Sequence, residues 1–228
     1  MAFAPYVPPE QLIKDRSEYA RKGIARGRSV VALEYADGLL FLAENPSATL
    51  HKISEIYDRI AFAGVGRYSE FEDLRIAGVR LADLRGYSYG REDVTAKMVA
   101  NAYAQALSAI FTQQMKPYEV ELLVGQVGDG AGGNELYHVL FDGSVTDEHG
   151  FVAMGGRAEE LTDHLREGYG DGMALGDAVR LATRALAAVE QEQPLAAANV
   201  EAAILDRMRS RRKFRRLGDT EVVGILGA

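Results

Sequence analysis

Cysteine is absent from the sequence, which excludes disulfide bonds, thiolate metal sites and a cysteine nucleophile. A membrane-spanning apolar run is absent too, and Met1–Pro5 lacks the basic start and apolar stretch of a secretory signal. We therefore expect a cytoplasmic protein with no membrane partner. No internal repeat or low-complexity linker divides the chain, and 228 residues with 47% hydrophobic content can bury a sizeable core. A single domain over residues 1–228 is expected.

The charge is negative overall but unevenly spread. A formal net charge of -7 disfavours general affinity for nucleic acid, yet Arg207–Arg216 is strongly basic. Two interpretations of this run stay open. It is either a nucleic-acid-binding segment, whose aromatic content is limited to Phe214, or a subunit-contact or solvated segment.

The first forty-five residues predict a helix followed by a hairpin. Pro8 and Pro9 fix the backbone just before a charged stretch, and proline is tolerated in a first helical turn, so a helix is expected from Glu10 to about Arg26. Ser29–Tyr35 and Leu39–Glu44 are rich in β-branched and large apolar residues, which favour strands. Between them, Ala36-Asp37-Gly38 is a tight-turn signal.

Downstream, strands and helices alternate in blocks rather than one by one. Further strands are expected over Ile60–Gly64, Val120–Val127, Glu135–Phe141, Phe151–Met154 and Val200–Leu205. Further helices are expected over Arg67–Leu84, Asp93–Gln114, Arg157–Glu167, Leu175–Val189 and Asp219–Leu226. Strand blocks separated by helix pairs favour antiparallel sheets covered by helices over a parallel βαβ array. The predicted class is α+β.

Three chemical patterns are weaker than they look. Gly86–Gly90 matches the G-x-S-x-G nucleophile elbow, but the preceding residues resemble the end of a helix, so we expect an interhelical loop. Gly128, Gly130 and Gly133 match G-x-G-x-x-G, but a strand follows where a dinucleotide site needs a helix, so a hairpin loop is expected. The histidines show no metal-ligand spacing and are interpreted as surface or loop residues: His51, His138, His149 and His164.

Several short blocks, in order between about residues 6 and 216, resemble the α-type subunits of the proteasome core particle, most closely the actinobacterial ones. The blocks are Pro9–Gln11, Arg21–Ala25, Ser29–Leu33, Glu44–Pro46, Lys52–Arg59, Lys116–Leu122 and Met154–Gly156. This resemblance implies the four-layer αββα sandwich of the N-terminal nucleophile hydrolases.

The resemblance also implies that the chain has no catalytic residues, no cofactor and no metal. Catalytic β-type subunits use an N-terminal threonine whose free α-amine helps to take the hydroxyl proton. Here the equivalent strand begins at Ser29, which follows Arg28 rather than glycine and has a helix upstream. Asn45 is expected to replace the β-type lysine, while Asp37 matches an acidic β-type position and is also explained by turn chemistry. A non-catalytic subunit of a threonine-type endopeptidase complex is therefore expected.

The partners implied by the resemblance are other copies of the chain in a seven-membered ring, a stacked ring of β subunits and a ring-shaped AAA ATPase. An N-terminal tail of α subunits closes the axial pore; the other interpretation of this segment is a frayed terminus. The gate candidates are Met1, Ala2, Phe3, Ala4, Pro5, Tyr6, Val7, Pro8 and Pro9. The helix that follows, about 9–26, is expected on the outer face of the ring.

Docking of the ATPase is expected at Lys52. Activators of this family insert C-terminal peptides, ending in a hydrophobic residue, tyrosine and any residue, between neighbouring α subunits, where a lysine binds the terminal carboxylate. Lys52 matches that lysine, and Glu18 is a second candidate at the pocket rim. The actinobacterial resemblance further implies substrates that carry a prokaryotic ubiquitin-like tag.

Two other functions stay open. Cleavage ahead of Ser29 would give an active N-terminal nucleophile hydrolase, and the basic run 207–216 would give a protein that binds RNA or DNA. Loss of the first helix from the intact mass would indicate the first, and steep salt dependence of nucleic-acid affinity the second.

Overall fold

Two antiparallel sheets form the centre of the computed structural model, which describes residues 8–129, 133–190 and 197–227. Each contains five strands in this part of the chain. In spatial order the first sheet is β10 (Phe214–Leu217), β9 (Val200–Asp206), β2 (Gly38–Glu44), β1 (Val30–Tyr35) and β8 (Phe151–Met154). The second is β3 (Ile53–Tyr57), β4 (Ile60–Gly66), β5 (Val120–Gln126), β6 (Glu135–Val139) and β7 (Val145–Asp147).

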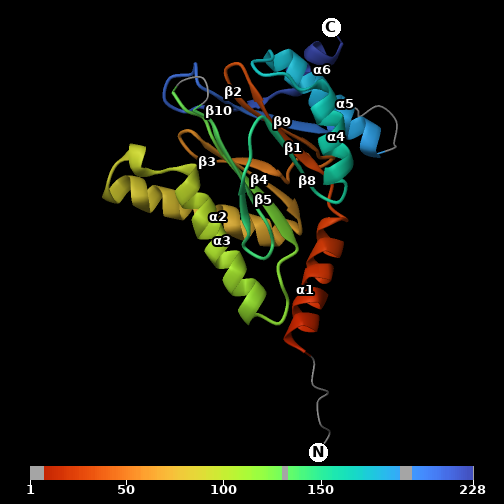
Figure 1. Cartoon of the computed structure of the whole chain (residues 1–228). Helices are drawn as coiled ribbons and strands as arrows, with labels where there is room; N and C mark the ends of the chain where they lie inside the picture. The colour runs from red at the N-terminus through yellow and green to blue at the C-terminus, as the bar shows by residue number, and fades with distance from the viewer. Residues whose placement is uncertain (1–7, 130–132, 191–196, 228) are drawn as a thin grey trace, which may run out of the picture.

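Helices cover the outer faces of both sheets (Figure 1). On the second sheet lie α2 (Tyr68–Ser88) and α3 (Ala96–Gln113), with the short η1 (Arg91–Asp93) between them. On the first sheet lie α4 (Ala158–Gly168), α5 (Leu175–Glu190) and α6 (Asp219–Leu226), and η2 (Ala197–Asn199) leads into β9. The order helix, sheet, sheet, helix confirms the predicted αββα sandwich.

The alternation of side chains along β2 shows how the layers are held together. All seven residues of β2 are buried, because each face of the strand packs against a different layer. Leu39 and Phe41 join the core between the two sheets, whereas Leu40 and Leu42 face α4 and α5 on the other side. A strand buried on both faces has an almost continuous apolar sequence, as Leu39–Ala43 does.

The first helix, α1 (Pro9–Ile24), stands apart from these layers. It projects from one end of the sandwich, with its N-terminal end pointing away from the sheets (Figure 1). Only Ala20 and Ile24 among its residues are buried, while Leu12, Ile13 and Tyr19 are exposed. The helix is therefore anchored at its C-terminal end.

The predicted elements are present, with shifts at their ends, but three strands of the described part of the chain were missed. The strand β8 and the helix α6 begin and end at the predicted residues. The missed strands are β3, which buries only Ile53 and Ile56, β7, whose three residues are all exposed, and β10, which begins inside the basic run. None of them shows the long apolar alternation that indicates a strand in a sequence.

The weak motifs resolve in different ways. Gly86–Ser88 forms the last turn of α2, while Tyr89 and Gly90 lie in the connection that follows, so the predicted interhelical loop begins later than expected. A helix rather than a strand precedes the serine, as expected. Gly128 and Gly133 lie in the loop between the antiparallel strands β5 and β6, which confirms the hairpin; residues 130–132 lie outside the described residues.

Three of the histidines, His51, His149 and His164, are exposed as predicted, but His138 is a half-buried residue of β6. In the described part of the chain no group of histidine and acidic residues could hold a metal ion. The described helices include none long and apolar enough to cross a bilayer.

Candidate functional site

The connection between α1 and β1 carries the candidate site, because it contains the serine that corresponds to a β-type nucleophile. The helix ends with hydrogen bonds from the Ala25 amide to the Arg21 carbonyl, 2.9 Å, and from the Gly27 amide to the Ile24 carbonyl, 2.8 Å. Ser29 follows and is only 2% exposed. Its amide nitrogen is part of the peptide bond to Arg28, so Ser29 has no α-amine.

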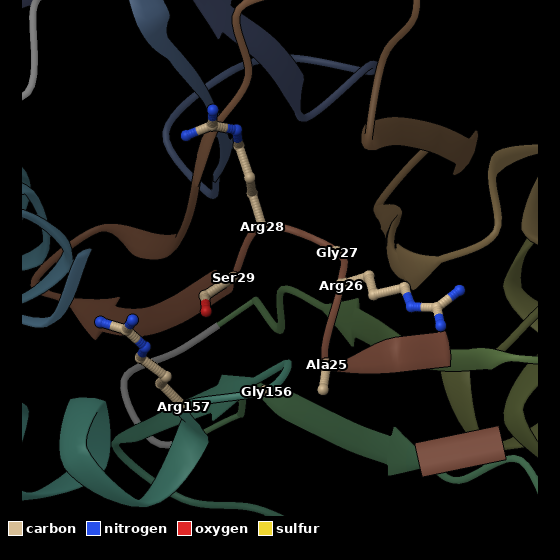
Figure 2. Close-up of a pocket in the computed structure, with 7 residues that line it drawn as sticks. All are labelled: Ala25, Arg26, Gly27, Arg28, Ser29, Gly156 and Arg157. Atoms are coloured by element: carbon tan, nitrogen blue, oxygen red, sulfur yellow. The ribbon is translucent and has the colours of Figure 1, made fainter. Parts of the chain in front are cut away.

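A pocket of about 250 Å³ opens beside this connection (Figure 2). It is lined by Ala25, Arg26, Gly27, Arg28, Ser29, Gly156 and Arg157. In Figure 2 the guanidinium groups of its three arginines point in different directions, while the hydroxyl of Ser29 points toward the Gly156–Arg157 turn. Three charges that diverge do not make a focused anion site.

Two glycines let the turn after β8 approach the connection closely. Gly155 has φ +116°, and a Cβ there would lie 3.1 Å from both Cα and Oγ of Ser29. A Cβ at Gly156 would lie 2.7 Å from Cα of Ala25. The contact at Gly156 is closer than real Cβ atoms come, and Gly155 combines a tight contact with a positive φ, so the Met154-Gly155-Gly156 block has a direct packing explanation.

Besides the arginines of the pocket, two charged side chains contact the residue before the serine, Glu44 and Lys52. β1 and β2 pair with Val30 opposite Ala43, which brings Glu44 to the serine end of the hairpin. Glu44 is buried and forms an ion pair with Arg28. From the other side, Nζ of Lys52 donates a 2.5 Å hydrogen bond to the carbonyl oxygen of Arg28.

This arrangement bears on two residues, Asp37 and Asn45, that the resemblance connects with β-type positions. Asp37 does not lie near Ser29; it is in the turn at the far end of β1, a strand of six residues and so about 20 Å long. There its carbonyl accepts a 2.9 Å hydrogen bond from the Arg207 amide, in keeping with a turn role. The replacement of the β-type lysine by Asn45 stays a prediction; the ammonium next to the Arg28–Ser29 connection is that of Lys52.

Asn45 organises the loop that leads to Lys52. Its Nδ2 donates to the carbonyl of Leu50 at 2.6 Å, and its Oδ1 accepts from the amide of Ser47 at 3.0 Å. The loop then passes into β3, so Lys52 directly precedes a short strand, as the resemblance implies. Lys52 itself is half-buried.

Glu18 lies on the exposed part of α1, six residues before the helix ends. That spacing corresponds to about 9 Å along the helix axis. Of the gate candidates, Met1–Val7 lie outside the described residues, Pro8 caps α1 and Pro9 is its first residue.

A four-charge network of Arg67, Glu70, Lys116 and Glu119 lies against the C-terminal part of α1. Nζ of Lys116 lies 2.5 Å from Oε1 of Glu70 and 3.1 Å from Oε2 of Glu119, and Arg67 also pairs with Glu119 at 3.0 Å. Burial alone would lower the pKa of Lys116, but the hydrogen bonds that its ammonium donates to the two carboxylates outweigh this effect and the pKa is raised. Glu119 packs against Gly23 of α1, where an added Cβ would lie 2.4 Å from its Oε1.

The basic run is largely paired within the chain. Arg212 binds Glu55, Arg215 binds Glu221, and Nζ of Lys213 donates to the carbonyl of Arg207 at 2.7 Å. These contacts make the run the turn before β10 and part of that strand. Guanidinium groups already neutralised by carboxylates contribute less to the electrostatic attraction on which nucleic-acid binding depends.

Comparisons with known proteins agree with the geometry. A family model described as "Proteasome subunit" matches residues 24–205. The chain is 56% identical over 228 residues to "Proteasome subunit alpha" of Frankia alni, covering 97% of this chain and 95% of that protein. It is 58% identical over 230 residues to the protein of the same name from Nocardioides sp., covering 100% and 90%, and 59% identical over 221 residues to that of Xylanimonas cellulosilytica, covering 93% and 91%.

Proposed function

The chain belongs to the proteasome subunit family, and we propose that it serves as a non-catalytic alpha subunit of the proteasome core particle. In this role it forms seven-membered outer rings, stacks on rings of β subunits, controls substrate entry and docks a ring-shaped AAA ATPase in the cytoplasm. The observation that carries the proposal is the way the residues ahead of Ser29 are built into the fold: α1 buries Ala20 and Ile24 against the sandwich, and Arg28 is held by Glu44 and Lys52.

The connection between α1 and β1 leaves the nucleophile chemistry incomplete. An N-terminal nucleophile needs its own α-amine as the base for its hydroxyl, and Ser29 has a peptide nitrogen there. Lys52 and Glu44 do lie nearby, but the ammonium of Lys52 holds the Arg28 carbonyl and Glu44 pairs with Arg28. Both side chains therefore bind Arg28, which cleavage ahead of Ser29 would remove.

Peptidase assays test this proposal. The purified chain should not cleave short fluorogenic peptides, and co-assembly with a β subunit should supply the activity. A Ser29→Ala chain should support the same activity in the co-assembled complex. Turnover by the chain alone that disappears in Ser29→Ala would overturn the proposal and favour a processed hydrolase.

The exposed apolar side chains of α1 support contacts with other subunits. The side chains of Leu12, Ile13 and Tyr19 are 46%, 55% and 46% exposed. Exposed large apolar side chains on one helix suit a contact with another subunit. In a ring, α1 would place these side chains and Glu18 on the outer face, next to neighbouring copies or a docked activator.

Lys52 has suitable chemistry for the activator carboxylate. It is half-buried, and an ammonium bears three donors, so it can hold the Arg28 carbonyl and a carboxylate at the same time. A charge-assisted hydrogen bond in a partly desolvated site is stronger than one between neutral groups. Because Lys52 touches the connection to α1, a peptide bound there would lie close to the base of the segment that carries the proposed gate, 1–9.

We also propose that the complex degrades proteins that carry a prokaryotic ubiquitin-like tag, and the support for this is the similarity to the actinobacterial relatives alone. Delivery of tagged and untagged unfolded proteins to the assembled complex, with and without the ATPase, would test it. Degradation that requires both the tag and the ATPase is expected.

A further inference from the structure

The side chain of Glu201 joins segments that are far apart in the sequence. Glu201 lies in β9, and its two carboxylate oxygens are nearly covered, with the side chain 9% exposed. Oε2 accepts hydrogen bonds from Nδ2 of Asn45 at 2.7 Å and from the amide of Lys52 at 2.9 Å. Oε1 accepts from the amide of Ile53 at 3.2 Å and from Arg216 at 2.7 Å.

These contacts fix both ends of the Asn45–Ile53 loop to one carboxylate. Nδ1 of His51 adds a further contact, 3.3 Å from Oε1 of Glu201. Arg216 also donates to the carbonyl of Ile53 at 2.6 Å, so the same arginine secures the carboxylate and the start of β3. Removing a buried carboxylate that accepts several hydrogen bonds costs free energy of folding, because each of its donors would be left buried without a partner.

The orientation of Lys52 follows from this arrangement. Its backbone amide points to Glu201, and its carbonyl accepts a 3.0 Å hydrogen bond from the amide of Gly64. With both backbone groups held, the side chain is directed to the Arg28 carbonyl. The position of the Lys52 ammonium thus depends on Glu201, whose carboxylate binds the backbone amide of Lys52.

We propose that Glu201 is the positioning residue for Lys52 and that it makes the ammonium ready to bind a carboxylate-ended peptide. The inference rests on the proposed docking role of Lys52. Glu201 itself does not touch the peptide; it restricts the loop so that less motion is lost when the carboxylate binds.

Peptide binding to the complex assembled with β subunits tests the inference. The probe is a synthetic peptide ending in leucine, tyrosine and alanine, compared with the same peptide as a C-terminal amide. In the parent the carboxylate form should bind more tightly. Glu201→Gln should weaken the carboxylate form about fivefold or more, because a carboxamide cannot accept all of the hydrogen bonds, and should change the amide form little.

Glu221→Gln is the matched control. Glu221 pairs with Arg215 of β10 as Glu201 pairs with Arg216, at 2.6 and 2.7 Å, but Glu221 lies in α6. It should leave both peptides unaffected. Hydrogen exchange should be faster at Lys52 and Ile53 in Glu201→Gln and unchanged in Glu221→Gln.

The outcomes separate the inference from the proposed docking role. If Lys52→Ala removes the preference for the carboxylate and Glu201→Gln keeps it, the inference is wrong and docking stands. If Lys52→Ala keeps the preference, the docking role is wrong and the inference falls with it. A double variant of both residues should bind no worse than Lys52→Ala alone if Glu201 acts through Lys52.

Should Glu201→Gln fail to assemble, Asn45→Ala provides the second test. It removes one donor from the carboxylate and the bond to the Leu50 carbonyl without changing Glu201. A smaller loss of carboxylate preference is expected, and an unchanged preference would count against the inference.

Discussion

The two ends of the β1–β2 hairpin each bring an acidic residue next to an arginine but differ in structure. Glu44 pairs with Arg28 at one end, and the backbone of Asp37 contacts the backbone of Arg207 at the other. At the serine end, Glu44 is 5% exposed, and Glu44 and Lys52 both bind Arg28 in the connection between α1 and β1. At the turn end, Asp37 is exposed and contributes a backbone carbonyl to a local contact. Substitutions at the serine end should therefore affect other segments and partners, whereas those at the turn end should remain local.

The sharpest way to test this difference is to change Lys52. Lys52→Glu should abolish activation by the ATPase, because the new carboxylate repels the peptide terminus, and Lys52→Ala should weaken it strongly. One charge-assisted hydrogen bond contributes about 1.5 to 3 kcal/mol, and the loss is repeated around a multivalent ring. Activator binding and ATP-dependent protein degradation would measure the effect.

Two properties serve as controls for this prediction: ring assembly, and peptide hydrolysis by the assembled complex without the activator. Both should be retained in Lys52→Ala, since the β subunits are unchanged. Variants of Lys52 that assemble, bind the activator and degrade protein like the parent would show that the serine end has no docking role.

Removal of residues 1–7 tests the tail that α1 connects to the serine end. If the tail closes the pore, hydrolysis by the assembled complex should become faster, with a larger gain for unfolded proteins than for small peptides. The β sites themselves do not change, so only access is altered. Equal rates before and after truncation, for both substrate sizes, would indicate a frayed terminus without a gating role.

The glycines beside Ser29 should matter mainly for stability. Gly155→Ala should lower the free energy of unfolding by about 1 to 3 kcal/mol, because it adds a Cβ close to Ser29 at a positive φ. Gly172→Ala is the matched control, since Gly172 has φ +71° with nothing within 4 Å of the added Cβ. Thermal unfolding of the two variants separates crowding from backbone strain, and equal losses would contradict the close packing at Ser29.

The smallest effect is expected at the turn end. Asp37→Asn should change the free energy of unfolding by less than about 0.5 kcal/mol, as for most exposed positions. Activator binding should not change at all. A strong docking defect in Asp37→Asn, with folding intact, would remove the distinction between the two ends.

The sequence was sufficient for most of the fold and for part of the site. Strands such as β2 could be predicted because both of their faces are apolar, while β10 was hidden because charged residues separate Phe214 from Leu217. The roles of Glu44 and Asp37 could have been found from the two-residue turn. A turn at Ala36 and Asp37 fixes the register that places residue 44 across from residue 29.

Glu201 had no comparable signal. Its partners Asn45 and Lys52 are about 150 residues away in the chain, and only the pairing of β2 with β9 brings them together. The same holds for the basic run, whose carboxylate partners come from β3, β9 and α6. Composition identifies such charges but not their partners.

The intact mass of the chain inside an active complex tests the central claim most directly. The chain would be co-expressed with a β subunit, purified as rings that are checked by electron microscopy, and weighed after its peptidase activity is measured. We predict seven-membered rings, activity, and a chain that still carries α1 and the Arg28–Ser29 peptide bond. An active complex in which the chain has lost residues 1–28 would contradict the account, because Ser29 would then have the α-amine that a nucleophile requires.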